Sequence, residues 1–416
     1  MSFFTTQPYY IRFMTDCKSG DTSCNEGISS AQTVSDWRQP PENTLPSLIH
    51  GISNSDGIEL DLRLTSDGEL IIHHDAKVSV NKAAIDKHNP YVESWSLDEL
   101  REFGFCSFKE MISNKTILSN WRDEGKMVCL ELKRPHPKSP LGGGYFGGRT
   151  VTKLLSKMME NASSILDEFE IPKSNTVFYA FHNKMHESVK LSGSQYRWAE
   201  LLPVVPRFGH SRLKRMMAYP QYLITPFGKL INKHRTRGAS MVPCALEYFQ
   251  PFYNRLLIGK SVGLSGKRLK YFQTCRTGMP VYVWPAKENY ESRLLESGIT
   301  GLTDNLNPDF TWYKEGKARW KYPATQPLDK SQLQLLKSAK FENHQDILQQ
   351  LSVEVPKWSE CDTQRKLEII KMWQAKWNWE LKPREMKDDS ISSPPWQSVR
   401  LIGHRGSGKT SRPVMK

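Results

Sequence analysis

The sequence lacks long apolar runs and closely spaced cysteines. No stretch approaches the roughly 20 apolar residues that a membrane-spanning helix needs. The start, MSFFTTQPYYIRFM, lacks the basic region and apolar centre of a secretion signal. The seven cysteines are odd in number, widely spread and without the CxxC pairing of a zinc site, which fits a reducing compartment. We therefore expect a soluble, cytoplasmic protein.

Acidic residues are in deficit, with 44 Asp and Glu against 58 Lys and Arg, a net charge of +14. Such a field can attract nucleic acid, an anionic membrane surface or an anionic substrate. No nucleic-acid-binding motif is present, so we expect no nucleic-acid partner. The densest basic segment, residues 207–237, interleaves Lys and Arg with Phe and Tyr. Both a solvated basic face and peripheral contact with an anionic membrane remain open for it.

The stretch from Gly57 to Asp75, GIELDLRLTSDGELIIHHD, organises the chain. Its period of two puts four aliphatic residues on one face of a strand and Glu59, Asp61 and Arg63 on the other. Because SDG is a turn sequence, a short returning strand should then bring His74 near the two carboxylates.

Strands and helices alternate along the rest of the chain. Helices are predicted over 45–54, 96–103 and 151–169, and further strands over 126–133, 176–181, 199–205, 240–246, 281–284 and 301–303. Asn43 and Thr44 are positioned to cap the first helix. The alternation predicts a parallel sheet closed into a (β/α)₈ TIM barrel. The Gly-rich loop after the 126–133 strand suggests a lid flanked by Tyr145 and Phe146.

The composition divides the chain into four parts. We expect an N-terminal extension at 1–38, most of the barrel at 39–313, a helical connector at 314–398, and a C-terminal segment at 399–416. Apolar residues recur at helical spacing through the connector.

Several short motifs carry polar residues that suit phosphodiester chemistry. They are PENT at 41–44, ExD at 59–61, TSDG at 65–68, HD at 74–75, ExK at 131–133, Trp284, TD at 303–304 and GHRG at 403–406. Together they resemble the glycerophosphodiester phosphodiesterase family. Every motif stands in family order except HRG, which the family places first and this chain places last.

The resemblance implies a role for each motif. It implies that Glu59, Asp61 and Glu131 are ligands of a divalent metal, Mg²⁺ or Ca²⁺, and that Glu42 and Asn43 support these ligands. It implies that His404 and His74 form the acid/base pair and that Arg405 and Lys133 bind the phosphate. Trp284 would contact the alcohol. These residue types match the chemistry, because carboxylates suit hard cations and imidazole titrates near neutrality.

The displaced HRG motif has competing interpretations. Residues Gly403 to Thr410 also satisfy the Walker A pattern, but only six residues follow, with Pro413 among them, too few for the helix that such a loop requires. In a closed barrel the first and last strands are neighbours, so a circular permutation would keep every strand pair. Alternatives are a second, truncated copy of the domain, or strand exchange with a neighbouring chain.

Two classes of function follow from the resemblance. The first is metal-dependent hydrolysis of glycerophosphodiesters to an alcohol and glycerol 3-phosphate, or lysophospholipase D-type cleavage of lysolipid phosphodiesters. The second is a barrel that binds phosphate or lipid without catalysis.

Overall fold

Eight parallel strands form a nearly closed barrel in the computed structural model, which describes residues 37–78, 89–144, 148–202, 223–251, 261–377 and 391–410. Around the barrel they follow the order β5 (Arg197–Glu200), β4 (Thr176–Ala180), β3 (Met127–Leu132), β1 (Gly57–Leu64), β11 (Leu401–Gly403), β8 (Thr300–Thr303), β7 (Val281–Trp284) and β6 (Val242–Ala245). Two backbone hydrogen bonds join β5 to β6, from Ser240 N to Trp198 O and from Leu202 N to Pro243 O. The predicted TIM barrel is confirmed.

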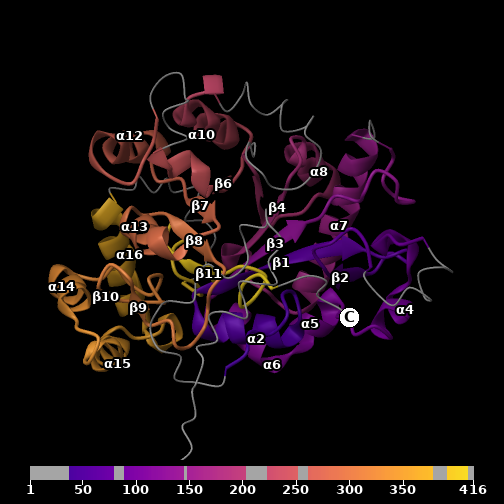
Figure 1. Cartoon of the computed structure of the whole chain (residues 1–416). Helices are drawn as coiled ribbons and strands as arrows, with labels where there is room; N and C mark the ends of the chain where they lie inside the picture. The colour runs from indigo at the N-terminus through magenta and orange to yellow at the C-terminus, as the bar shows by residue number, and fades with distance from the viewer. Residues whose placement is uncertain are drawn as a thin grey trace, which may run out of the picture.

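Helices surround the strands (Figure 1). They are α2 (Leu45–Asn54), α4 (Leu97–Arg101), α5 (Phe108–Ser113), α6 (Lys115–Leu118), α7 (Gly148–Glu168), α8 (Met185–Ser192), α10 (Phe227–Thr236), α12 (Gly266–Arg276) and α13 (Glu288–Glu296). Shorter turns of helix lie at Val92–Ser94, Ser119–Asp123, Lys173–Asn175, Leu246–Phe249 and Trp358–Glu360. Within the described residues, no helix combines the length and apolar character that crossing a membrane requires.

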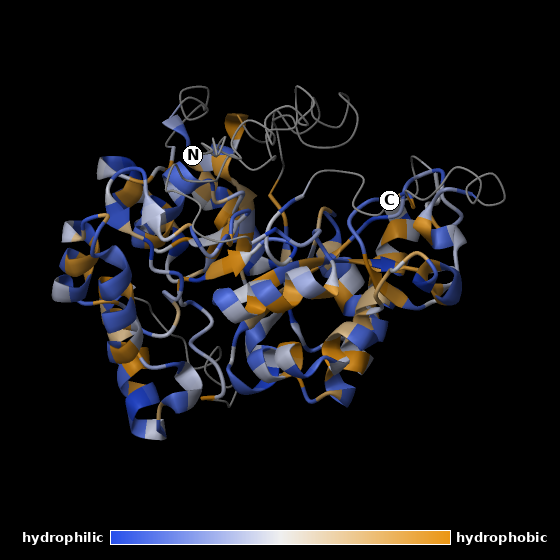
Figure 2. Cartoon of the chain, turned by 60° about the horizontal axis from the view of Figure 1, so that its bottom comes forward, coloured by the Kyte–Doolittle hydropathy of each residue, from blue (hydrophilic) through white to orange (hydrophobic). Residues whose placement is uncertain are grey.

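Two apolar layers stabilise the barrel. The larger lies between the helices and the outer face of the sheet, and includes Ile58, Leu60 and Leu62 of β1. The smaller fills the barrel interior, and its members are Met127, Cys129, Val177, Tyr179, Ala199, Leu201, Met241, Tyr282, Leu302, Trp396 and Ile402. Because side chains alternate along a strand, every residue of β1 is buried on one face or the other. Figure 2 shows apolar residues along the central strands, whereas the surrounding helices carry both apolar and polar residues.

Strand β11 lies between β1 and β8 and is parallel to both. Gly57 pairs with Ile402, and Gly403 pairs with Thr303. The C-terminal HRG motif therefore begins at the carboxyl end of a barrel strand, next to the carboxyl end of β8. The strand completes the barrel of its own chain.

The segment before β11 closes the amino-terminal end of the barrel. Trp396 packs into the barrel interior and donates its indole N–H to Ser240 O. Arg400 is fully buried, and its two terminal nitrogens donate to the carbonyls of four residues, Pro394, Pro395, Trp396 and Ser398. On the other side, Asp56 Oδ2 accepts from Leu401 N at 2.9 Å. These bonds fix the point where β11 enters the barrel.

The region after β8 adds a small strand pair and three helices beside the barrel. They are β9 (Trp312–Tyr313), β10 (Lys317–Ala318), α14 (Lys330–Ser338), α15 (His344–Glu354) and α16 (Thr363–Trp377). The buried ion pair of Glu291 on α13 with Arg319 links this region to the barrel at 2.7 Å. The strand pair was not predicted, because two-residue strands have no readable sequence period.

Local predictions differ in accuracy. The turn at 66–68 is followed by β2 (Leu70–Ile72), which is antiparallel to β1 as expected. Helix α4, within the predicted 96–103 helix, begins with a capping box at Ser96. The 199–205 strand was placed too late, because β5 runs from Arg197 to Glu200. The lid residues Tyr145 and Phe146, the 1–36 extension and residues 207–222 of the basic segment lie outside the described residues.

Candidate active site

The polar residues of the site project from inward positions at the carboxyl ends of neighbouring strands. Glu59 and Asp61 lie on β1, Glu131 ends the same face of β3, and Lys133 follows two residues later. Deeper in the barrel the corresponding inward positions are apolar, as at Cys129. Because side chains alternate along each strand, the inward-facing residues are polar at the carboxyl-terminal end of the barrel and apolar deeper in its interior.

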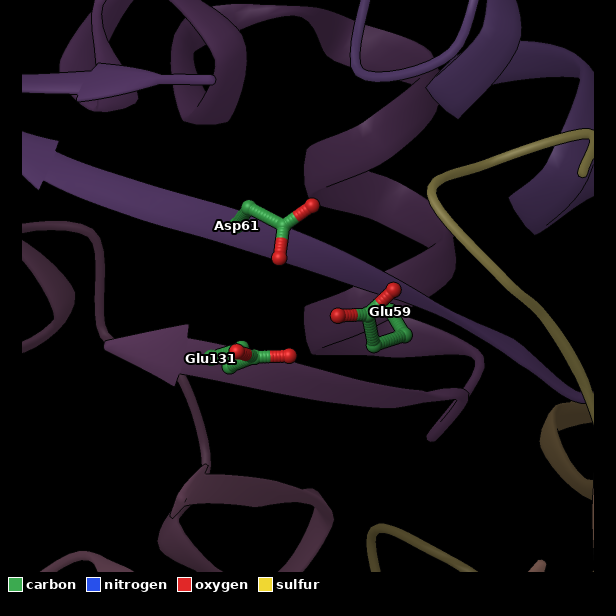
Figure 3. A group of neighbouring side chains, drawn as sticks. All are labelled: Glu59, Asp61 and Glu131. Atoms are coloured by element: carbon green, nitrogen blue, oxygen red, sulfur yellow. The ribbon is translucent and has the colours of Figure 1, made fainter. Parts of the chain in front are cut away.

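Three carboxylates form the centre of the site. Glu59, Asp61 and Glu131 each offer an oxygen that lies within 4.8 Å of the others, and Figure 3 shows their carboxylates converging from two adjacent strands. Burial, with Asp61 and Glu131 nearby, raises the pKa of Glu59 well above its usual value. Burial also raises the pKa of Glu131, although Lys133 opposes the shift.

Two cations offset part of this negative charge. Lys133 Nζ lies 2.6 Å from Glu131 Oε1 and 3.1 Å from Asp61 Oδ1. Arg405 Nε lies 3.3 Å from Asp61 Oδ2. Burial would raise the pKa of Asp61, but Lys133 and Arg405 outweigh it and hold that pKa well below its usual value. Asp61 is thus the carboxylate that stays ionised.

The donor set fits a hard divalent cation. Asp61 Oδ1 is buried without a hydrogen bond, and Arg405 Nε is buried without one as well. Oxygen donors are the ligands that Mg²⁺ and Ca²⁺ prefer, and a cation among them would relieve the repulsion that raises the pKa of Glu59.

The HRG turn is held in a strained conformation. Arg405 has φ of +53° and Gly406 has φ of +92°. A Cβ at Gly406 would stand 2.6 Å from the backbone of Ser47, so glycine is required there. Arg405 N donates to Glu59 Oε2 at 2.9 Å, and Arg405 O accepts from Asn43 N at 3.0 Å. The turn therefore places Arg405 by its backbone as well as its side chain.

The same turn does not act as a Walker A loop. A phosphate-binding loop presents its backbone N–H groups to the ligand. Here the N–H groups of six loop residues are used within the protein, namely those of His404, Arg405, Gly406, Ser407, Lys409 and Thr410. This arrangement agrees with the sequence argument against a nucleotide-binding loop.

His404 is oriented by Asp304, the residue that follows β8. The two are joined at 2.7 Å through His404 Nδ1, which turns Nε2 toward Glu59 Oε2, 3.8 Å away. Burial lowers the pKa of His404, and Asp304 opposes that shift. The pKa of Asp304 is itself held at about 2, because His404 and Lys409 outweigh its burial. The lowered pKa of His404 favours its neutral form, and the contact with Asp304 favours a proton on Nδ1.

Burial distinguishes the neighbouring histidines His73 and His74. His74 is half-buried, and its Nδ1 lies 2.8 Å from Asp75 Oδ1. His73 instead packs edge-on against Phe105, and burial together with Arg63 lowers its pKa to about 4. His73 therefore belongs to the core, whereas His74 has the carboxylate partner that His404 also has.

Glu42 and Asn43 lie behind the carboxylates. Arg405 Nη1 donates to Glu42 Oε1 at 2.7 Å, and Asn43 Nδ2 donates to Asp61 Oδ2 at 2.7 Å. Asn43 does not cap α2, whose N-cap residue is Thr44 and has no side-chain cap bond. The helix thus begins after Thr44 as predicted, but neither side chain caps it, because the Asn43 amide donates to Asp61 and the Thr44 hydroxyl donates to Pro41 O.

Trp284 lies at the mouth of the barrel and is partly buried. Its ring meets that of Phe181 edge-on, with centroids 5.7 Å apart. Phe181 is 40% exposed, and Lys133 Nζ lies 5.9 Å from its centroid. The aromatic pair thus borders the cations on the solvent side.

Two site residues were missed or undervalued by sequence reasoning. Tyr179 donates its hydroxyl to Glu59 Oε1 at 2.9 Å. Only its inward register on β4 could have indicated this contact. Asp304 orients His404, and in the sequence only its place in the TD motif marked it.

Comparisons with known proteins give one family match and several similar solved structures. Residues 33–173 match the model of the Glycerophosphoryl diester phosphodiesterase family. No curated protein matches the sequence. The chain is similar to solved structures of a glycerophosphodiester phosphodiesterase from Thermotoga maritima (15% identity, TM-score 0.36, covering 63% of this chain and 87% of that chain) and a phosphodiesterase from Oleispira antarctica in complex with the product sn-glycerol-3-phosphate (15%, 0.40, 64% and 88%). It is also similar to a glycerophosphodiester phosphodiesterase from Parabacteroides distasonis (14%, 0.38, 64% and 86%).

The barrel, its carboxylate centre and the family match define the class of this protein, which is a phosphodiesterase. The matched segment contains β1, β2 and β3, and with them all three carboxylates of the centre. Through this segment the chain is similar to the Glycerophosphoryl diester phosphodiesterase family.

Proposed function

We propose that this protein hydrolyses glycerophosphodiesters to an alcohol and glycerol 3-phosphate. The observation that supports it most directly is the convergence of three buried carboxylates, two cations and an Asp304-oriented histidine at one end of the barrel. Hydrolysis of a phosphodiester needs neutralisation of the phosphate oxygens, a base and an acid, and this group of residues can supply each of them.

Glu59, Asp61 and Glu131 would hold a divalent cation, Mg²⁺ or Ca²⁺. When bound, such an ion neutralises charge on the phosphate and on the attacking oxygen. Glu42 and Asn43 keep Arg405 and Asp61 in place through the two 2.7 Å bonds described above.

Arg405 and Lys133 would bind the non-bridging oxygens of the phosphate. A guanidinium offers paired donors in one plane, and Arg405 Nε is a buried donor without a hydrogen bond. Lys133 Nζ already lies among the carboxylates, at the side of the site that borders Phe181.

His404 and His74 would form the acid/base pair. Each has its Nδ1 on a carboxylate, so proton transfer falls to Nε2. The lowered pKa of His404 favours the neutral ring, which is the form that accepts a proton. His74 would then return a proton to the leaving alcohol.

Trp284 would pack against the alcohol. The exposure of Phe181 beside it favours a second candidate, lysophospholipase D-type cleavage, because an exposed aromatic pair can also contact an acyl chain. In that case the 207–237 segment would contact anionic membrane. A non-catalytic phosphate- or lipid-binding barrel is the remaining alternative.

We also propose that the chain is a circular permutation of its family, divided at 1–38, 39–313, 314–398 and 399–416. The position of β11 between β1 and β8 supports this, because the family's HRG motif would occupy the same place before the cut. If the protein keeps its activity and fold after deletion of Val399 to Gly406, the circular permutation is contradicted.

The test is release of glycerol 3-phosphate from glycerophosphodiesters with Mg²⁺, Ca²⁺ or EDTA. We expect metal-dependent release that falls about 100- to 10,000-fold in His404→Ala. His186→Ala, on the outer helix α8, is the matched control and should keep full activity. No release from any diester or lysolipid would favour the binding role, and full activity of His404→Ala would exclude the paired-histidine mechanism.

A further inference from the structure

The site depends on two loops that are far apart in the sequence. One carries Glu42 and Asn43 before α2, and the other carries Arg405 after β11. Both loops contain a non-glycine residue in the left-handed region, Asn43 at φ +58° and Arg405 at φ +53°. This backbone conformation is unfavourable for a residue with a side chain, so the surrounding contacts must hold it.

A reciprocal pair of hydrogen bonds joins the loops. Glu42 N donates to Thr410 Oγ1 at 3.1 Å, and Thr410 N donates to Glu42 Oε2 at 3.0 Å. Gln39 Nε2 adds bonds to Ser407 O at 3.3 Å and Lys409 O at 3.1 Å. We call these contacts between residues 39–42 and 407–410 the loop clasp.

The loop clasp acts directly on the phosphate-binding arginine. Glu42 is 1% exposed, and its two oxygens have different partners: Oε2 accepts from Thr410 N and Oε1 from Arg405 Nη1. A carboxylate held on one side presents its other oxygen in a fixed direction. The orientation of the Arg405 guanidinium plane is therefore set by Thr410, five positions further along the same loop.

We propose that Thr410 is a positioning residue that orients Arg405 for phosphate through Glu42, and that Gln39 supports it by holding the backbone of Ser407 and Lys409. This inference rests on the proposed function only for the identity of the ligand, a phosphate mono- or diester. Since neither residue is part of a motif that resembles the family, the residues following HRG in this chain take over a task that a continuous loop would perform.

The test uses the full chain with Thr410→Val, which removes the hydroxyl acceptor, and Thr410→Ser, which keeps it. Thr274→Val, at an exposed helix position, is the control. Binding of inorganic phosphate and of sn-glycerol 3-phosphate is measured by calorimetry with Mg²⁺, alongside KM, kcat and amide hydrogen exchange over 403–410.

We expect Thr410→Val to weaken phosphate binding and raise KM about 5- to 10-fold, with a smaller change in kcat and faster exchange in the loop. Thr410→Ser should restore affinity to within about twofold, which a purely structural role of the methyl group would not produce. If Thr410→Val fails to fold, Gln39→Leu takes its place with the same expectation.

Unchanged phosphate affinity in Thr410→Val, or equal losses in the valine and serine variants, would overturn the loop clasp as a positioning device. A wild-type protein that binds no phosphate would overturn it too. A wild-type protein that binds phosphate in a Thr410-dependent way but cleaves no diester would support the clasp while refuting the proposed reaction.

Discussion

The two ends of β11 each hold a buried arginine, and the two are bound in opposite ways. Arg400, at the amino-terminal end of the barrel, is surrounded by backbone carbonyls that accept from both terminal nitrogens. Arg405, at the carboxyl-terminal end, faces carboxylates, and its Nε makes no hydrogen bond. Burial is nearly equal, at 0% and 5% exposed.

The difference separates a structural charge, Arg400, from the charge that we propose binds phosphate, Arg405. Carbonyl dipoles can stabilise Arg400 in one place and leave it nothing further to bind. The carboxylates around Arg405 raise its pKa despite burial, so it stays charged with bonding capacity left over. Burial alone would not have distinguished the two residues.

The largest loss of activity is expected from a substitution at the carboxyl-terminal end of the barrel. Glu131→Gln keeps the shape of a buried side chain but removes a charge from the proposed metal site, so kcat/KM should fall about 1,000-fold. The unfolding midpoint in EDTA should stay the same or rise, because burial and Asp61 make the Glu131 charge costly. Activity assays and urea titrations check both results. A variant that is active, or strongly destabilised without metal, would contradict the functional assignment.

The reverse pattern is expected for Arg400→Met. The change leaves four buried carbonyls without their donor, so the free energy of unfolding should fall by about 3–5 kcal/mol. Below the melting temperature kcat should be within about twofold of the wild-type value, since Arg400 does not reach the site. Urea unfolding and initial rates on the same samples provide the measurement. Loss of kcat without loss of stability would remove the distinction between the two arginines.

The smallest effect concerns Asp56, beside Arg400. Burial raises its pKa to about 7, against opposition from Leu401 N–H and Arg400. Because the folded pKa lies above the unfolded value, stability is greatest below about pH 4 for this group and is lost as pH rises toward 7. Asp56→Asn should flatten the slope of unfolding free energy between these pH values. Urea titrations across that pH range measure it, and an unchanged slope would mean that Asp56 does not titrate there.

Sequence reasoning recovered the barrel and most of the carboxylate centre. The ExD alternation in β1 is local, so it places Glu59 and Asp61 on one face whatever surrounds them. The family pattern then added Glu131 and the displaced HRG, which pattern-matching can find at any distance. The alternation of side chains along one strand does not predict which side chains of different strands contact each other.

The missed features all depend on contacts between distant segments. The hydroxyl of Tyr179 meets Glu59 across 120 residues, and Asp304 meets His404 across 100. Asn43 was assigned to a helix cap by a local rule, but a tertiary partner, Asp61, took its amide. The strand β5 was misplaced because its pairing with β4, which runs from Arg197 to Glu200, and not its own composition, determines its bounds.

The insertion of β11 between β1 and β8 also has a consequence for protein synthesis. Asp56 and Leu401, whose contact joins β1 to β11, are 345 residues apart. At translation rates of roughly 5–20 residues per second, β1 would wait about 20–70 seconds on the ribosome before its neighbour exists. During that interval its β11-facing edge is unpaired, and such edges invite association with other chains. The nascent protein should therefore depend on chaperones more than a barrel without the segment between β8 and β11, because that segment delays synthesis of the closing strand.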